Sequence, residues 1–342
     1  MHSALHSFCV GEAQKSGILC AVNTQQHSGL SLKAFTNSCR WLSSYSHSFD
    51  YYVLFGTNIP RSIFFFLENS EMFVPPKLLR VLAFDTSISL QRVPVQLRGL
   101  VFLRYLSITQ WSEDLDHVMS NNPNLETLVV SGNGAPTIHL PSIIWKPPQL
   151  RHVKLGNSYM SLKFFLKDDI RGCCSNPIIL DHFDCLVGLE KLSISVSIGC
   201  NAALPEQCMY PLGLKKLKLS GANISERDLN VIAMLPQLMV LKLENSFHGA
   251  VWKVAERGFS ELRFLLLEAK ELKQWVAGQK HFRVLRHLVL RSCNCLEQIP
   301  MRFAKIYTLK SIVLEGCKSS LVASTKQQLQ QKERSKDVEV RS

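Results

Sequence analysis

Leucine and other aliphatic residues recur along the chain in one short pattern, in which they occupy the first, fourth and sixth of six positions. With Val, Ile or Phe allowed as substitutes, copies of the pattern begin at Leu79, Leu103, Leu125, Leu150, Leu189, Leu214, Leu238, Leu262, Leu285 and Leu309. Eight of the nine intervals between these starts are 22 to 25 residues long, and the interval from Leu150 to Leu189 is 39 residues. A recurrence this regular predicts stacked structural repeats.

The period and the punctuation identify the kind of repeat. The most complete copy places its frame residues at Leu285, Leu288, Leu290, Cys293, Leu296, Ile299, Pro300 and Phe303. Spacing of 20 to 29 residues with this frame is typical of leucine-rich repeats, in which each copy gives one strand and an irregular return. The sequence therefore predicts an α/β leucine-rich-repeat solenoid, with a curved parallel sheet on the concave side and an irregular or short helical convex side.

Amphipathic helices are the alternative explanation of leucines three residues apart. A leucine five positions after the first, such as Leu290 after Leu285, would leave the helical face, and Gly and Pro recur between the copies. Strands are therefore favoured. Burial of one leucine is worth roughly 1.5–3 kcal/mol, so a single repeat cannot offset its ordering entropy, and stability must be collective.

Changes in the pattern divide the chain into three parts. Residues 1–38 lie before the repeats, with a short amphipathic helix expected over residues 1–16 and a strand over 18–22. Residues 39–318 form the array, which strands near Trp41 and Ile63 would begin, with an irregular loop near 162–185 that contains a degenerate repeat. Loops on a rigid scaffold often carry recognition residues. Residues 319–342 are expected to form a polar helix that closes the last repeat, followed by a loose tail.

Composition sets the class of protein and its compartment. With 46% hydrophobic and 19% charged residues the chain is expected to fold. It has no secretory leader pattern and no run of 18 apolar residues, so we expect a cytoplasmic protein without a transmembrane segment. Peripheral association with a membrane surface is compatible with this expectation. Eleven scattered cysteines, an odd number, are expected to be free thiols in a reducing compartment.

Motifs for catalysis and metal binding are weak or missing. G-x-S-x-G and H-E-x-x-H do not occur, so binding rather than catalysis is predicted. Cys173, Cys174, His182 and Cys185 could gather around zinc, but paired Cys-x-x-Cys knuckles are missing, and no metal site is predicted. Cys293 and Cys317 occupy the Asn/Cys position of their repeats, where a small buried side chain can bond to the turning backbone.

Cationic residues recur at the positions that the strands expose. The residue after the first leucine is cationic in seven of ten copies, within a net charge of +12. Neighbouring cations about 5 Å apart repel each other unless water or an acidic partner screens them. The predicted protein-binding residues on the concave face are Arg80, Arg104, Arg151, Lys154, Lys191, Lys215, Lys218, Lys242, Arg263, Phe264, Arg286, Arg291 and Lys310.

Three interpretations of this face remain open: a solvated polar surface, a surface for an acidic protein partner, and a nucleic-acid surface. Nucleic acid is disfavoured because few aromatic residues interleave with the cations. Apolar residues expected on the same face, namely Val240, Phe264, Leu266 and Val289, suggest a patch for protein binding between Leu238 and Leu290.

Several motifs resemble one family. The start of the chain, Met1-His2-Ser3-Ala4-Leu5-His6-Ser7-Phe8-Cys9, resembles the Met-His-Asp motif and following helix that end the nucleotide-binding module of plant NLR immune receptors. Ser3 and Ser7 replace Asp of the family pattern. Three further stretches carry the resemblance: Cys39-Arg40-Trp41-Leu42, Arg80-Val81-Leu82 and the segment from Phe247 to Leu321. With them, the chain is most similar to the late-blight resistance type of nightshades.

The resemblance implies a function and partners. It implies the recognition and autoinhibition region of an intracellular immune receptor, in which residues 1–38 are a remnant of the end of the nucleotide-binding (winged-helix) module and His2 is the ADP contact that the family uses. Expected partners are the nucleotide-binding module of the same receptor, in cis or trans, and a pathogen effector or guarded host protein. Because no G-x-x-x-x-G-K-[ST] loop occurs, no ATP or ADP cofactor is expected in this chain, which would be a truncated or partial receptor. The alternative function is an F-box-type adapter of a ubiquitin ligase, although F-box helices are not evident before the repeats.

Overall fold

The computed structural model describes the strands, helices and turns that carry the repeats. The described residues are 8–9, 11–13, 15–16, 18–23, 40–45, 60–66, 78–85, 88, 99–109, 114–131, 137–141, 147–156, 161–165, 178–179, 188–195, 202–203, 211–331 and 338–341. They fall into two compact units, residues 1–150 (unit 1) and residues 151–342 (unit 2). Each unit is described separately.

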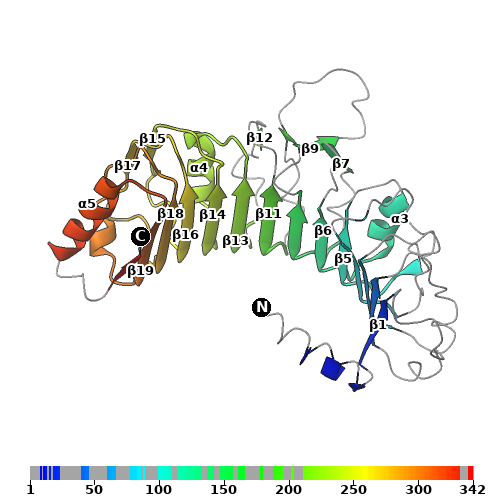
Figure 1. Ribbon diagram of the computed structural model, residues 1–342. Helices are drawn as coiled ribbons and strands as arrows, with labels where there is room; N and C mark the ends of the chain where they lie inside the picture. Colours follow the sequence, from blue (N-terminus) through cyan, green and yellow to red (C-terminus); the bar gives the residue numbers. More distant parts are fainter. Residues whose placement is uncertain are drawn as a thin grey trace. The chain divides into compact units, whose positions relative to one another are not determined.

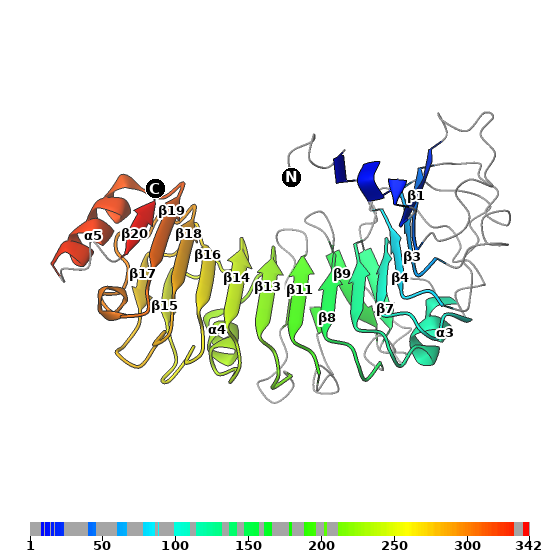
Figure 2. The same cartoon turned by 90° about the horizontal axis from the view of Figure 1, so that it is seen from below.

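Unit 1 is built on parallel strands that pair in chain order (Figures 1 and 2). The strands are β1 (Leu19–Asn23), β2 (Trp41–Tyr45), β3 (Ser62–Phe65), β4 (Val81–Phe84), β5 (Tyr105–Ile108) and β6 (Thr127–Val130). A helix, α3 (Asp114–Asn121), lies between β5 and β6, and β7 (Thr137–Pro141) follows. The register aligns one apolar residue from each strand from β2 to β6: Leu42, Ile63, Leu82, Leu106 and Leu128.

Unit 2 repeats this arrangement over more strands. Its parallel sheet consists of β8 (His152–Leu155), β11 (Lys191–Ser195), β13 (Lys216–Ser220), β14 (Val240–Glu244), β16 (Phe264–Glu268), β18 (His287–Arg291), β19 (Ser311–Glu315) and β20 (Glu339–Arg341). The register again aligns apolar residues: Val153, Leu192, Leu217, Leu241, Leu265, Leu288, Ile312 and Val340. The leucine-rich-repeat fold predicted from the periodicity is confirmed, and the helical alternative is wrong for these segments.

The return segments of unit 2 are short and mixed. They contain β9 (Ser161–Phe165), β10 (Ile178–Ile179), β12 (Ala202–Ala203), α4 (Glu226–Ala233), β15 (Val251–Lys253), β17 (Gln274–Val276), η6 (Phe303–Lys305) and α5 (Ser319–Gln330). Ser225 caps α4 by a reciprocal capping box with Asp228. The carboxylate of Glu226 then accepts a hydrogen bond from the backbone N–H of Lys253, which ties α4 to β15.

An aromatic core fills unit 2 behind its sheet. Trp252 and Trp275 lie in register on β15 and β17 and stack with ring centroids 4.9 Å apart. The Phe282 ring lies nearly perpendicular to both Trp rings, and Phe259 stacks on Phe282 at 5.1 Å. Phe303 of η6 packs against Trp275 at 4.9 Å. Rings in such contacts add to the energy of area burial, so this core is expected to stabilise unit 2 strongly.

The sheets extend beyond the expected ends of the array. The strand expected over residues 18–22 is β1, and it pairs in parallel with β2, although residues 1–38 were expected to lie outside the repeats. At the other end the helix expected near Ser319 is α5, but β20 pairs with β19 where a loose tail was expected. Exposed strand edges carry unpaired N–H and C=O groups, and an adjacent extended segment can satisfy them without matching the leucine frame.

Candidate functional site

The strands present alternate side chains on an exposed face, and this face is the candidate site. Counting from the first leucine of each repeat as position 1, the side chains at positions 4 and 6 are buried, as at Leu82 and Phe84 of β4. Position 2 precedes the strand, and positions 3 and 5 form rows across the exposed face. Position 7 joins them from Ser220 onward, whereas Thr109, Ser131 and Ser195 at this position are buried. Residues at one position of successive repeats therefore lie about 4.8 Å apart.

Unit 1 carries an uninterrupted row of arginines at position 2. The members are Arg40, Arg61, Arg80 and Arg104, and this set is named the first cationic row. All four are exposed. Backbone hydrogen bonds join each to the next: the N–H of Arg61 donates to the carbonyl of Arg40 at 2.9 Å, and the steps to Arg80 and Arg104 are 2.8 Å each.

A carboxylate closes this row at one end. The backbone N–H of Glu126 donates to the carbonyl of Arg104 at 2.9 Å, and the two side chains form an ion pair at 3.6 Å. Within the part of unit 1 that the structure describes, Arg40, Arg61 and Arg80 have no ion pair. Sequence reasoning missed Arg40 and Arg61. Each stands two residues before a buried aliphatic residue, Leu42 or Ile63, which is the offset that Arg80 has from Leu82.

Several cations of unit 2 are instead neutralised by carboxylates on the neighbouring strand. Lys215 bonds Glu190 at 3.0 Å, and Lys218 bonds Glu244 at 2.7 Å. The hydrogen bond from Lys215 is the main cause that lowers the pKa of Glu190 below its usual range, with the charges of Lys215 and Arg151 acting in the same sense. For these lysines the screening comes from within the chain: Glu190 occupies the same repeat position as Lys215, whereas Glu244 lies two positions beyond Lys242, the register partner of Lys218.

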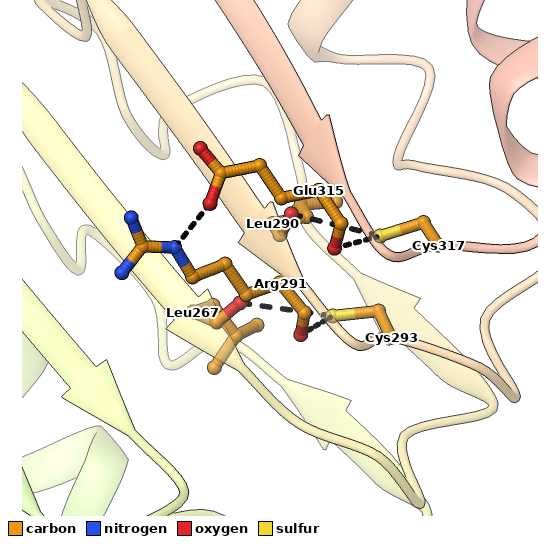
Figure 3. Close-up of polar contacts among 6 residues, drawn as sticks. All are labelled: Leu267, Leu290, Arg291, Cys293, Glu315 and Cys317. Carbon is orange, nitrogen blue, oxygen red and sulfur yellow. Dashed lines mark hydrogen bonds and ion pairs between the residues drawn. The ribbon is translucent and has the colours of Figure 1, made fainter. Parts of the chain in front are cut away.

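Arg291 is also paired within the chain. Its side chain forms a hydrogen-bonded ion pair with Glu315 of the next strand (Figure 3). Sequence reasoning named the cation but not the acid. The signal was present, since Arg291 and Glu315 both occupy position 7 of adjacent repeats.

Three other predicted cations of unit 2 form a second unpaired row at position 2. Arg263, Arg286 and Lys310 are exposed, and this set is named the second cationic row. The N–H of Arg286 donates to the carbonyl of Arg263, and that of Lys310 to Arg286, both at 2.8 Å. Among the described residues none of the three has an ion pair.

Apolar side chains lie beside the second cationic row. Val240, Phe264 and Val289 are partly exposed, as expected, whereas Leu266 is buried with 4% exposure. The expectation for Leu266 is therefore wrong: Lys242 and Val289 flank it in register and restrict its access to water. The ammonium of Lys242 lies 5.5 Å from the centre of the Phe264 ring, a cation–π contact.

Two cysteines bond to the turn after their strands. The Cys293 thiol donates to the carbonyls of Arg291 at 3.4 Å and Leu267 at 3.7 Å (Figure 3). The Cys317 thiol makes the equivalent bonds to Glu315 and Leu290, both at 3.6 Å. The predicted bonds to the turning backbone are confirmed for both residues; Cys293 is buried, as predicted, whereas Cys317 is partly exposed. Contact with Cys317, followed by burial, raises the pKa of Cys293, so its thiol stays protonated.

The other predicted residues are separate from these rows or lie outside the description. Arg151, Lys154 and Lys191 are exposed near β8 and β11 of unit 2. His2, most of the 162–185 loop and the cysteines and histidine of the zinc alternative lie outside the described residues. Where the chain is described, no three His, Cys, Asp or Glu side chains are grouped so as to hold a metal ion. Within the same residues, none of the helices combines the length and the apolar character needed to span a bilayer.

Comparison with known proteins supports the resemblance. The chain is 29% identical to the late blight resistance protein homolog R1B-13 of Solanum demissum, over 90% of this chain and 30% of that protein. It is 26% identical to homolog R1B-23 and 26% identical to late blight resistance protein R1-A of the same species, over 95% of this chain in both cases. The similarity to the late-blight resistance type is thus confirmed, and the chain spans about 30% of the length of these relatives. No family model matches the sequence.

Similar solved structures are more distant. A chain of the Toll–Spatzle complex from Drosophila matches with 14% identity and a TM-score of 0.42, over 82% of this chain and 46% of that chain. An internalin of Listeria monocytogenes matches with 13% identity and a TM-score of 0.40, over 77% and 80% of the two chains. The fold assignment rests on the in-register parallel strands described above.

Proposed function

We propose that this chain is the leucine-rich-repeat recognition and autoinhibition region of a plant intracellular immune receptor. The similarity to late blight resistance proteins over 90–95% of the chain supports the receptor class. The strand face supports a role in binding protein, because its exposed rows are held on a rigid sheet. We propose the nucleotide-binding module of the same receptor as the partner of unit 1.

The first cationic row is the observation that carries this proposal. Arginines on strands about 4.8 Å apart raise one another's electrostatic energy, and only Arg104 has a carboxylate partner among the described residues. An acidic protein surface would remove this repulsion and accept several charge-assisted hydrogen bonds. Such complementarity mainly sets specificity and the rate of association. A clamp of this kind would hold the module until an effector or modified host protein competes for the scaffold.

A binding experiment with matched charge changes tests the clamp. The full chain is mixed with the nucleotide-binding fragment of a late-blight-type receptor, and the dissociation constant is measured by biolayer interferometry. Arg61→Glu with Arg80→Glu should weaken association about tenfold or more, because two unpaired cations become repulsive. Arg61→Lys with Arg80→Lys should keep most of the affinity.

The control carries the same change of net charge elsewhere. Lys273→Glu with Lys305→Glu alters exposed cations on the return segments of unit 2 and should leave association unchanged. Circular dichroism of every variant checks folding. Equal affinity of the Arg61/Arg80 reversal and the unmodified chain would show that the first cationic row does not bind the module.

A further inference from the structure

The face of β14, β16, β18 and β19 in unit 2 has rows of different chemistry. The second cationic row lies at the beginning of the strands. Val240 and Phe264 at position 3, and Val289 and Val313 at position 5, give partly exposed apolar side chains next to it. The row at position 7 follows at the carboxyl ends of the strands. It holds Glu244, Glu268, Arg291 and Glu315.

Only one edge of this face keeps a large uncompensated charge. Glu244 is paired with Lys218 and Glu315 with Arg291, so the row at position 7 is largely neutral, with Glu268 unpaired among the described residues. The second cationic row at the opposite edge has three exposed cations without an ion pair among the described residues, and the adjacent acid, Glu339, is itself paired with Arg341. A ligand of this face therefore needs negative charge along one edge and apolar groups beside it.

We propose that this face binds an amphipathic α-helix of a protein partner, and that the helix lies across the strands. Acidic residues along one edge of its apolar stripe would meet Arg263, Arg286 and Lys310. Phe264 and Val289 would contact the apolar stripe. The inference rests on the proposed function only in treating the strand face as a protein-binding surface, and it concerns other residues than the first cationic row.

The repeat distance of the row selects a helix. Cations on successive strands are about 4.8 Å apart, and one turn of an α-helix rises 5.4 Å. Acidic side chains on successive turns are therefore displaced from the cations by only about 1 Å over two intervals. Long Arg and Lys side chains can absorb that difference. In an extended peptide, side chains on one face repeat about every 6.6 Å, which drifts by almost 4 Å over the same two intervals.

The width of the face also fits a helix. Positions 2 and 7 are five residues apart along the strand, or about 16 Å. A helix with its side chains is about 10–12 Å across, so it can rest on positions 3 and 5 between the two edges, where Val240, Phe264, Val289 and Val313 are interspersed with Lys242, His287 and Ser311. The apolar floor is fixed by Phe264, which contacts Lys242 and lies 6.5 Å from the His287 ring. His287 in turn bonds Ser311 at 2.8 Å. Because these contacts restrain the side chains of Phe264 and His287, both lose little rotamer freedom on binding.

A set of constrained helical peptides tests the proposal on the full 342-residue chain. The first peptide is a lactam-constrained helix of about four turns, with a leucine stripe and Glu along one edge. The second has Gln in place of each Glu, and the third has Lys. Fluorescence anisotropy should give an affinity about tenfold higher for the Glu peptide than for the Gln peptide, and lower still for the Lys peptide.

Variants of the chain then assign the contact. Arg263→Gln, Arg286→Gln and Lys310→Gln together should abolish the preference for Glu over Gln. Phe264→Ala should weaken both peptides by about fivefold, because it removes apolar contact and no charge. The matched control is Lys253→Gln, Lys273→Gln and Lys305→Gln, which removes three exposed cations from the return segments and should change neither affinity.

Three results would overturn the inference: equal binding of the Glu and Gln peptides, an equal loss in the control variant, or tighter binding of a single-stranded oligonucleotide that depends on the same three cations. The last result would assign the row to nucleic acid. Failure here leaves the Arg61/Arg80 experiment on unit 1 unaffected, so the two proposals can fail separately.

Discussion

Unit 1 and unit 2 use the same in-register strands but differ in the charge that these strands present. In unit 1 four consecutive repeats place arginine at position 2, and the only described carboxylate at that position, Glu126, ends the row. In unit 2 acids at positions 2 and 7 of adjacent strands neutralise Lys215, Lys218 and Arg291. One backbone scaffold can thus carry an unpaired row of cations or cations that are neutralised within the chain, because the exposed positions contribute little to the core.

The cores of the two units differ as well. Unit 2 has contiguous aromatic contacts that link Trp252, Trp275, Phe282 and Phe303. In the described residues of unit 1 the stacked pair is Phe65 and Phe84, with ring centroids 5.2 Å apart. Unit 2 should therefore depend on a few large side chains, whereas the described core of unit 1 depends mainly on aliphatic residues of its strands.

The largest expected effect comes from Trp252, which is fully buried in the aromatic core. Trp252→Ala should destabilise unit 2 by about 3–5 kcal/mol, because it removes four ring contacts and leaves a cavity. Urea denaturation followed by circular dichroism measures the loss. Leu212→Ala, at a side chain that is 70% exposed, is the control and should change stability by less than about 0.5 kcal/mol. An equal loss in both variants would contradict the assigned core.

Salt should separate the two binding surfaces. Raising the salt concentration from 0.1 to 1 M shortens the Debye length from about 10 to 3 Å, so association through the first cationic row should weaken about tenfold or more. Binding of the Glu helix to unit 2 should weaken less, because Phe264 and its neighbours add an apolar contribution. Parallel titrations of the two complexes measure this. Identical salt dependence would show that the two faces do not differ in the way proposed.

A pH dependence is expected from unit 2. Burial, the main cause, and the charge of Arg302 lower the pKa of His281 from its ordinary value of 6.5, while backbone contact with Ala255 and the charge of Glu256 oppose the shift. The folded state therefore favours neutral His281, whose Nδ1 accepts a hydrogen bond from the N–H of Gly278 at 2.8 Å. This stability is fully present above pH 6.5 and is lost as the pH falls toward the lower folded pKa.

Thermal unfolding at pH 7.5 and pH 5.5 measures this effect. His281→Gln keeps an acceptor without a titrating group, so it should reduce the difference in midpoint temperature between the two pH values. A difference that persists unchanged in this variant would assign the pH dependence to other residues. The loss should be smaller than that caused by Trp252→Ala.

The smallest expected effect has opposite signs in the two units. Arg80→Gln should stabilise unit 1 by a few tenths of a kcal/mol, because it removes a cation that has cationic neighbours and no acid among the described residues. Lys215→Gln should destabilise unit 2 by a similar amount, because it breaks the ion pair with Glu190. Urea denaturation at low salt measures both changes. The same sign in both variants would contradict the difference in charge compensation.

The repeat frame predicted much of this structure. The leucines at positions 1, 4 and 6 fixed which strands form, their register and which side chains are buried, as Leu285, Leu288 and Leu290 illustrate. The cationic position after the first leucine was visible in the same frame. Arg40 and Arg61 were missed because their repeats lack the leading leucine, although the following strand residues keep the pattern. β20 was missed because three residues are too few to give a periodic signal.

The sequence by itself determined the fold and the residue types on each row, since burial of regularly spaced apolar side chains leaves one register that satisfies every repeat. Only the tertiary structure decided which charges meet. The pairing of Lys218 with Glu244, which lie at different positions of their repeats, and the isolation of Arg263 and Arg286 depend on distances between side chains of separate strands. Such distances are set by the packing of neighbouring repeats, because residues about 24 positions apart in sequence become adjacent only when the strands stack.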